Sequence, residues 1–268
     1  MAILLVLLAG CTGVRAESPA RIALLAPFEG RYREIGYAAL YPARLALDDL
    51  ERADVTLLPI DDGGSANSAA DRARALVLDP LVKAVIVLGY DAAASETLDA
   101  FDDLPVIVVG GWHSAPLNAH QFALALPPGA GDSERLDVTA AARLDAPLTG
   151  GEVLALEGFR RLRADLTGVT VISAGSLPGA DFTARIMASD PFAVEPGLLA
   201  TLVYDAVSAA AHVIDEPGAA RAQVSENLQS VDFAGLNGLI RFDESGQWRD
   251  APRNAFCYDD SRQLAGCQ

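Results

Sequence analysis

The residues best placed to bind a ligand follow the end of the first predicted strand. Five apolar residues, Ile22 to Ala26, form a run short enough for a strand buried on both faces, and a proline and a glycine end it. In an open parallel sheet, ligands bind where loops leave the carboxyl ends of the strands. We therefore expect Phe28, Glu29 and Tyr32 to face a binding site, with the alternative that the aromatic side chains belong to the core.

The motifs of several common enzyme classes are missing from the sequence. It contains no G-x-S-x-G nucleophile elbow, no G-x-G-x-x-G loop, no Walker A loop and no H-E-x-x-H pair. Asp61 and Asp62 end the second predicted strand and could bind a ribose, but without a glycine loop upstream a turn or helix cap is favoured. We expect no enzyme activity, no cofactor and no metal site.

Alternating strands and helices must position the loop residues. After the first strand, apolar residues recur at helical spacing from Ile35 to Leu50 and predict a helix. Pro42 should bend this helix near its middle. Further strands are predicted at Val55–Ile60, Ala84–Leu88 and Val106–Val109. A helix is predicted at about 65–78, and a second, short helix ends at Leu98. This alternation predicts a parallel sheet covered on both faces, so the first 125 residues should form one doubly wound lobe.

The pattern changes after Leu126, where a Pro/Gly-rich stretch predicts a crossing between lobes. Helices are predicted around 133–143 and over 152–166, with a short segment at 147–151 and one clear strand at 169–173. The second lobe therefore looks reduced. Helices at 195–214 and 219–228 follow, and residues 239–248 should form two strands around a turn at 243–246.

Composition and charge exclude some classes of partner. The chain has 268 residues, 51% of them hydrophobic, and a net charge of -16. With about 150 residues per domain, this length allows one large domain or two small lobes with a real core. The negative charge repels phosphate backbones at long range, so we do not expect the protein to bind nucleic acid.

The first ten residues indicate export. They are apolar and uncharged and too few to span a bilayer, which is typical of a signal-peptide core. Leu8-Ala9-Gly10-Cys11 resembles the lipobox of bacterial lipoproteins, in which the cysteine is acylated; the alternative is a buried cysteine in an N-terminal strand. If Cys11 carries lipid, Cys257 and Cys267 remain as a pair that an oxidising compartment would join.

Several segments together carry a family resemblance. They are IALLAPFEGRYREIGYAALYPARLALDDL, DDGGSANSAADRARALVLDPLVKAVIVLGYDAAASET, LPVIVVGGWHSAP, LDAPLTGGE, EPGLLATLVYDAV and FAGLNGLIRFDESGQW. In this order, behind a lipobox, the chain resembles the substrate-binding lipoproteins of branched-chain amino acid ABC transporters, which are type I periplasmic binding proteins. The resemblance implies an α/β fold of two Rossmann-like lobes, joined by a hinge and holding an amino acid between them.

The resemblance also implies roles for individual residues. Ser114 matches the hydroxyl that binds the ligand's main chain, and Glu152 matches the acid that binds its ammonium group. A zwitterion needs such donors for its carboxylate and one buried carboxylate for its ammonium. Alternatively, Ser114 caps a turn and Glu152 opens a helix, where a carboxylate is favoured by the helix dipole. Trp112 and Tyr90, like Phe28 and Tyr32, either line the cleft or pack in the core.

These observations predict a signal peptide at 1–10 and a tether at 11–20. Residues 21–125 with about 183–235 should form lobe 1, and about 126–182 with 236–268 should form a reduced lobe 2. We expect a solute-binding protein in the cell envelope, anchored by lipid on Cys11, that binds an amino acid or related polar solute and delivers it to an ABC permease. The alternative is an envelope lipoprotein that acts as an interaction or scaffolding module without a small ligand.

Overall fold

The larger of two main sheets has five parallel strands in the order β2-β1-β3-β4-β5. A computed structural model describes residues 19–113, 117–128 and 137–267 of the chain. The strands are β1 (Ala20–Ala26), β2 (Val55–Asp61), β3 (Val82–Val87), β4 (Val106–Val109) and β5 (Gln121–Leu124). Strands β3, β4 and β5 are buried throughout, as expected for apolar runs in a parallel sheet covered by helices.

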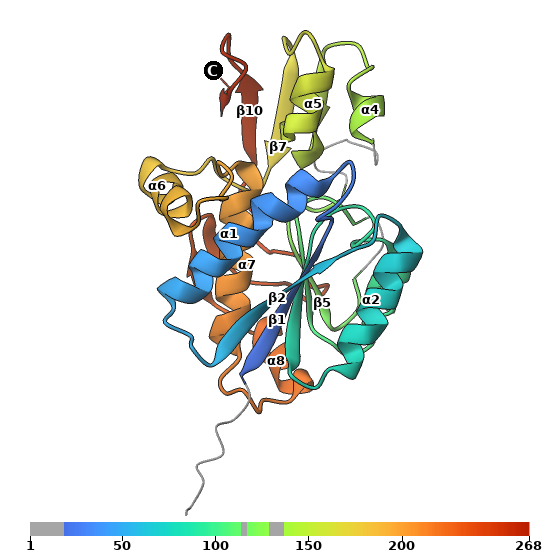
Figure 1. Ribbon diagram of the computed structural model, residues 1–268, viewed down its shortest axis with the longest axis vertical. Helices are drawn as coiled ribbons and strands as arrows, with labels where there is room; N and C mark the ends of the chain where they lie inside the picture. The colour runs from blue at the N-terminus through green and yellow to red at the C-terminus, as the bar shows by residue number, and fades with distance from the viewer. Residues whose placement is uncertain (1–18, 114–116, 129–136, 268) are drawn as a thin grey trace, which may run out of the picture.

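Helices cover both faces of this sheet (Figure 1). Helices α1 (Arg33–Asp49) and α7 (Leu198–Val213) pack against each other, and α6 (Ala180–Ser189) lies against α1. Helices α2 (Ala66–Leu78) and α3 (Ser95–Asp99) contact each other, and α8 (Arg221–Gln229) contacts α7 and β3. Helix α1 continues through Pro42 to Asp49. The predicted doubly wound architecture is confirmed.

The smaller sheet has four strands in the order β11-β10-β7-β6. Strands β6 (Leu148–Gly150) and β7 (Val169–Ser173) are parallel, and β10 (Asn254–Tyr258) runs antiparallel to both β7 and β11 (Leu264–Gly266). The sequence predicted only one clear strand here. The others are three to five residues long, and two of them come from the C-terminal end of the chain.

Short helices complete the smaller lobe: α4 (Val138–Ala141), the 3-10 helix η1 (Glu152–Ala155) and α5 (Glu157–Leu162). The single helix predicted over 152–166 is wrong, because Leu156 is extended between η1 and α5. This break allows Leu154, Leu156 and Phe159 all to be buried in the core. The reduced second lobe expected from the sequence is confirmed.

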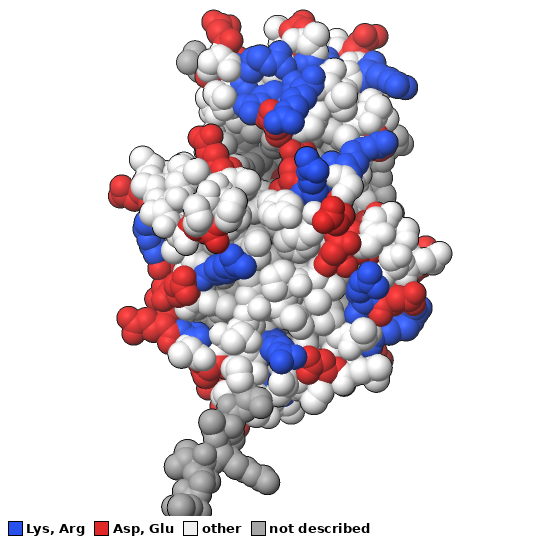
Figure 2. All heavy atoms as spheres, in the orientation of Figure 1, with Lys and Arg blue, Asp and Glu red and all other residues white. Residues whose placement is uncertain are grey.

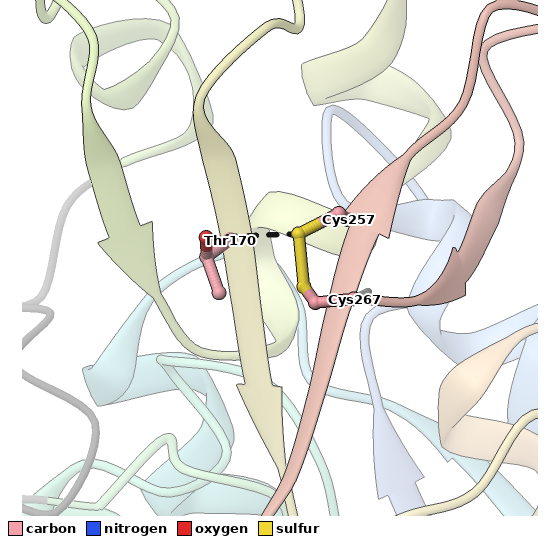
Figure 3. The surroundings of a disulfide bond; sticks show 3 residues. All are labelled: Thr170, Cys257 and Cys267. Atoms are coloured by element: carbon pink, nitrogen blue, oxygen red, sulfur yellow. Dashed lines mark hydrogen bonds between the residues drawn. A yellow bond between two sulfur atoms is a disulfide. The ribbon is translucent and has the colours of Figure 1, made fainter.

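The C-terminal disulfide joins two strands at the edge of the smaller sheet. Cys257 in β10 and Cys267, directly after β11, have Cα atoms 5.0 Å apart, and Thr170 of β7 contacts the Cys257 sulfur (Figure 3). A disulfide that closes so short a loop typically contributes about 2 to 3 kcal/mol to the free energy of unfolding. It therefore fixes an edge strand that has few core contacts of its own.

A hairpin near the C-terminus adds to the larger lobe. Strands β8 (Phe233–Gly235) and β9 (Gly238–Ile240) pair with each other, and Phe242 bridges Trp248 around the predicted turn at 243–246. Gly246 has φ +77°, and a side chain there would come within 2.2 Å of the Gln121 carbonyl oxygen. Only glycine therefore lets this turn approach β5 so closely.

The division into lobes stays a proposal, which these pairings refine. Gln247 bridges Ala123 of β5, whereas Asn254 already pairs with Ser173 in the smaller sheet. We therefore place the last crossing between lobes at 249–253 instead of 235–236. The buried apolar residues of both sheets belong to one contiguous cluster. No helix in the described part of the chain has the length and apolar character needed to cross a membrane.

Candidate functional site

Three aromatic rings form a row along the carboxyl edge of the larger sheet. Tyr32 precedes α1, Tyr90 follows β3, and Trp112 follows β4. The ring centroids of Tyr32 and Tyr90 are 5.7 Å apart and those of Tyr90 and Trp112 are 5.1 Å apart, both in edge-to-face arrangements. Because β1, β3 and β4 are neighbours in the sheet, their loops meet at one edge. The topology therefore brings together three residues that lie far apart in the sequence.

Glu152 of the smaller lobe reaches one end of this row. One of its carboxylate oxygens accepts a hydrogen bond from the Gly111 backbone N–H at 3.1 Å, and the other accepts one from the Ser173 hydroxyl at 2.7 Å. The Ser173 oxygen in turn accepts from the Gly175 N–H at 3.0 Å. Glu152 is only 5% exposed. Burying a carboxylate is costly, so these donors are needed to hold it there.

At the other end of the row, the smaller lobe meets the start of α1. The Val138 N–H donates to the Tyr32 hydroxyl at 3.1 Å, and Arg31 pairs with Asp137 at 2.6 Å. Glu34 accepts from the Gly158 N–H at 3.1 Å. Burial raises the pKa of the Glu34 carboxyl and that of the Tyr32 phenol. We call the two ends of this junction the Glu152 end and the Arg31 end.

Asp61 and Asp62 organise the loops beside the row. Asp61 accepts from the backbone N–H groups of Phe28, at 2.7 Å, and Glu29, at 3.1 Å, while Asp62 accepts from the Gly64 N–H at 2.9 Å. Burial, followed by repulsion from Asp91 and Asp61, raises the pKa of Asp62 to about 6. These contacts agree with the turn role that the sequence favoured over ribose binding.

Four of the predicted ligand-binding residues lie at this edge: Tyr32, Tyr90, Trp112 and Glu152. Trp112 is only 1% exposed and packs in the hydrophobic core, which is the alternative that the sequence left open for it. Phe28 is not part of the row, because its ring packs edge-on against Tyr37 of α1, with centroids 5.8 Å apart. Ser114 and Cys11 lie outside the described residues. In the described ranges, no group of three or more His, Cys, Asp or Glu side chains is arranged to hold a metal ion.

Sequence reasoning missed the partners of Glu152. Ser173 ends strand β7, so the strand-end rule that selected Tyr32 would also have selected it. Gly111 contributes only its backbone N–H. Every residue except proline has this group, so the residue type does not indicate the contact. Glu152 does open a short helix, which was the alternative interpretation of this residue. Its carboxylate nevertheless points across the junction to Gly111 instead of capping its own helix.

Comparisons with known proteins place this geometry in context. Residues 19–144 match the family model described as periplasmic binding protein. No curated protein sequence matches the chain. The branched-chain amino acid transporter substrate-binding protein LivJ from Streptococcus pneumoniae, solved with isoleucine, superposes with a TM-score of 0.64 at 16% identity, over 93% of this chain and 100% of that one.

Two further solved structures show the same fold. The leucine-binding protein LivK from Thermotoga maritima has a TM-score of 0.69 at 15% identity, over 93% of this chain and 98% of that one. An ABC transporter solute-binding protein from R. palustris, solved with benzoate, has a TM-score of 0.63 at 12% identity, over 92% and 95%. The resemblance expected from the sequence is thus confirmed: residues 19–144 carry the periplasmic binding protein family pattern, and the chain has the type I periplasmic binding protein fold.

Proposed function

We propose that this protein is an exported, lipid-anchored solute-binding protein of an ABC uptake system. It binds an amino acid or a related small polar solute between its two lobes and delivers it to a membrane permease. The family match and the shared fold support this class of protein. Its work is binding and hand-off, with no covalent chemistry.

The observation that carries the proposal is the contact between Glu152 and Gly111. A buried carboxylate from the smaller lobe lies at the loop after β4, next to Trp112 and the aromatic row. A solute ammonium group would bind to this carboxylate, because charge-assisted hydrogen bonds are the strong ones. The apolar part of the solute would lie against the rings of Tyr90 and Tyr32. Ser114, in the same loop, remains the proposed donor to a solute carboxylate.

Binding would be coupled to closure of the lobes. The contacts of the smaller lobe with Tyr32, Glu34 and Gly111 form only when the lobes are together. A ligand that favours the joined state shifts the population by its difference in affinity for the two states. The solute would therefore stabilise the form in which these hydrogen bonds are made, and that form would be the one a permease recognises.

A thermal-shift panel of amino acids and small amides tests the proposal. Ligand at 100 times its dissociation constant adds about 2.7 kcal/mol to the free energy of unfolding. For a domain of this size that corresponds to a rise in Tm of roughly 5 to 10 °C. A saturable rise with at least one solute is expected, and no rise with any of them would contradict solute binding.

The lipid anchor has a test of its own. With acylation of Cys11, the protein expressed in a bacterial host should partition into the membrane fraction and incorporate labelled fatty acid. Cys11→Ala should abolish the incorporation and release the protein. Labelling that persists in Cys11→Ala would show that the anchor is elsewhere.

One observation favours the second candidate, an envelope scaffold without a small ligand. The lobes are already joined by contacts of the chain itself, namely Arg31 with Asp137, Val138 with Tyr32, and Gly158 with Glu34. A scaffold needs a fixed lobe arrangement and no solute to close it. The thermal-shift panel separates the two candidates, because a scaffold would melt at the same temperature with every compound.

A further inference from the structure

A buried serine joins Glu152 to the chain that crosses between the lobes. Ser173 ends β7 and has no exposed surface. Its hydroxyl oxygen accepts a hydrogen bond from the Gly175 N–H at 3.0 Å, and the hydroxyl donates to a Glu152 carboxylate oxygen at 2.7 Å. A serine hydroxyl has one proton, and a backbone N–H can only donate. The serine proton must therefore point to Glu152, so one orientation of the hydroxyl satisfies both neighbours.

The segment that follows Ser173 crosses from the smaller lobe to the larger one. Residues 174–179, which we call the crossing segment, connect β7 with α6, and α6 packs against α1 (Figure 1). Gly175 lies so close to α7 that a Cβ atom there would be 2.9 Å from the Leu198 carbonyl oxygen. On the face drawn in Figure 2, the surface is indented between the two lobes. A shift of the crossing segment would therefore move the lobes relative to each other.

The larger lobe holds the crossing segment at Ser176. The side-chain oxygen of Asn237, between β8 and β9, accepts from the Ser176 N–H at 2.7 Å and from the Ser176 hydroxyl at 2.8 Å. The Asn237 side-chain amide donates to the buried Asp205 of α7 at 2.8 Å. Thr201 of α7 donates to the Ser176 carbonyl oxygen at 2.9 Å. Ser176 is thus fixed to α7, three residues after Ser173.

These contacts form a path of hydrogen bonds from the junction into the larger lobe. The path runs from the Gly111 N–H through Glu152 and Ser173 to the crossing segment. It continues from Ser176 through Asn237 to α7. The carboxylate that the smaller lobe presents at the junction and the chain that connects the lobes therefore meet at one hydroxyl group.

From this path we propose that Ser173 is a positioning residue, which holds the Glu152 carboxylate at the junction and couples its position to that of the crossing segment. The inference rests on the proposed function, because Glu152 is the group proposed to bind the solute. A solute bound to Glu152 would act through Ser173 on the chain between the lobes. Adjacent contacts alone do not demonstrate coupling, so the test has to measure it.

Hydrogen–deuterium exchange of the purified chain without solute, resolved to single amides, tests the positioning of Glu152. The Gly111 N–H bonds to the carboxylate oxygen that Ser173 does not bind. Ser173→Ala should therefore raise exchange of the Gly111 amide about tenfold or more, while exchange in β1 serves as the reference for global unfolding. Unchanged exchange at Gly111 in a folded Ser173→Ala protein would overturn the proposal.

Ser173→Cys provides a second variant in case Ser173→Ala does not fold. The thiol keeps the approximate shape of the side chain but is a weaker donor. We expect exchange of the Gly111 amide to rise about threefold, less than in Ser173→Ala. No rise in a folded Ser173→Cys protein, when Ser173→Ala does not fold, would also count against the proposal.

A double-mutant cycle tests the coupling to the crossing segment. The Ser176 N–H bonds to Asn237, so its exchange reports how firmly this segment is held. Glu152→Ala and Ser173→Ala should each raise this exchange about tenfold. If Ser173 carries the coupling, the double variant should stay within about threefold of Ser173→Ala, whereas independent effects would multiply to about a hundredfold. Multiplied effects, or no effect of Glu152→Ala, would overturn the coupling.

Ser225→Ala is the matched control. Ser225 is also a buried serine, 5% exposed, and its hydroxyl oxygen lies 3.0 Å from the His120 Nδ1 atom in the larger lobe. Its removal should leave exchange at Gly111 and Ser176 within about twofold of the unaltered protein. An increase as large as that of Ser173→Ala would show general loosening and contradict a specific role for Ser173.

The exchange measurements contain no solute, so their outcome is separate from that of the thermal-shift panel. A rise in Tm together with absent coupling would overturn the inference and leave solute binding standing. Coupling without a rise in Tm for any compound would support the positioning role of Ser173 and contradict the proposed solute binding.

Discussion

The two ends of the junction between the lobes are built differently. At the Glu152 end, a carboxylate only 5% exposed is held by two neutral donors. At the Arg31 end, an ion pair lies at the surface, with the side chains of Arg31 and Asp137 exposed by 58% and 48%. Exposed ion pairs contribute about 0.2 to 1 kcal/mol, whereas a buried polar group left without its partner costs about 1 to 3 kcal/mol. The buried end should therefore dominate both stability and recognition.

Removal of the carboxylate at the Glu152 end should have the largest effect. Glu152→Ala leaves the Gly111 N–H and the Ser173 hydroxyl without their acceptor. We expect the free energy of unfolding to fall by roughly 2 to 4 kcal/mol and solute binding to be lost. Urea denaturation with unchanged m-value measures the first effect, and calorimetry measures the second. A loss below 0.5 kcal/mol would contradict the claim that the buried Glu152 end dominates stability.

A variant at Asp62 tests the free-energy cost of burying a carboxylate away from the junction, within the larger lobe. Its side chain is 2% exposed, and its pKa is raised from 3.8 to about 6. The folded state therefore binds the proton more tightly than the unfolded state, so stability from this group is present below pH 4 and is lost as the pH rises to about 6. Asp62→Asn should remove this loss and stabilise the protein at pH 7.5 by on the order of 2 kcal/mol.

The control for Asp62→Asn is its pH dependence. At pH 4 the native Asp62 is largely protonated and resembles asparagine, so the stability difference between the two proteins should shrink. Chemical denaturation at pH 4, 5, 6 and 7.5 follows this change. An equal difference at every pH would show that Asp62 does not titrate in this range.

Tyr32 joins the aromatic row to the Arg31 end. Tyr32→Phe keeps the ring contact with Tyr90 and removes the hydroxyl that accepts from the Val138 N–H at 3.1 Å. We expect a loss of about 1 kcal/mol, typical of one hydrogen bond. Thermal denaturation measures it. A loss as large as that of Glu152→Ala would place the dominant contact at the Arg31 end.

Arg31→Ala should have the smallest effect. The pair with Asp137 is exposed, so we expect a loss of roughly 0.2 to 1 kcal/mol that disappears at high salt. Denaturation at 0.05 and 1 M sodium chloride tests the salt dependence. A larger loss that persists at 1 M salt would contradict the surface character of this end.

The sequence predicted the larger sheet and part of the site. The alternation of apolar runs with helical patterns predicted the parallel strands. The strand-end rule selected Tyr32, and the sheet topology brings this residue beside Tyr90. Phe28 was misplaced, because Gly36 lacks a side chain and a Cβ there would lie 2.9 Å from the Phe28 ring. Phe28 therefore packs against α1 and not into the row.

Other features depend on contacts between distant segments. Strand β5 and strands β10 and β11 are too short to show a period, and β10 is defined by its pairing with β7, which precedes it by about eighty residues. The backbone donor of Gly111 was likewise invisible to sequence reasoning. The resemblance did select Glu152, but its contact across the junction follows only from how the lobes are packed.

Fluorescence of Trp112 tests the central claim, that a solute binds beside Glu152 and the aromatic row, most directly. The chain has two tryptophans, and Trp248 lies away from the row, with its indole N–H donating to the Leu239 carbonyl. In Trp248→Phe protein, titration with a solute that raises the Tm in the thermal-shift panel should change Trp112 emission in a saturable way. Unchanged Trp112 emission with a solute that raises the Tm would place the solute elsewhere and contradict the account.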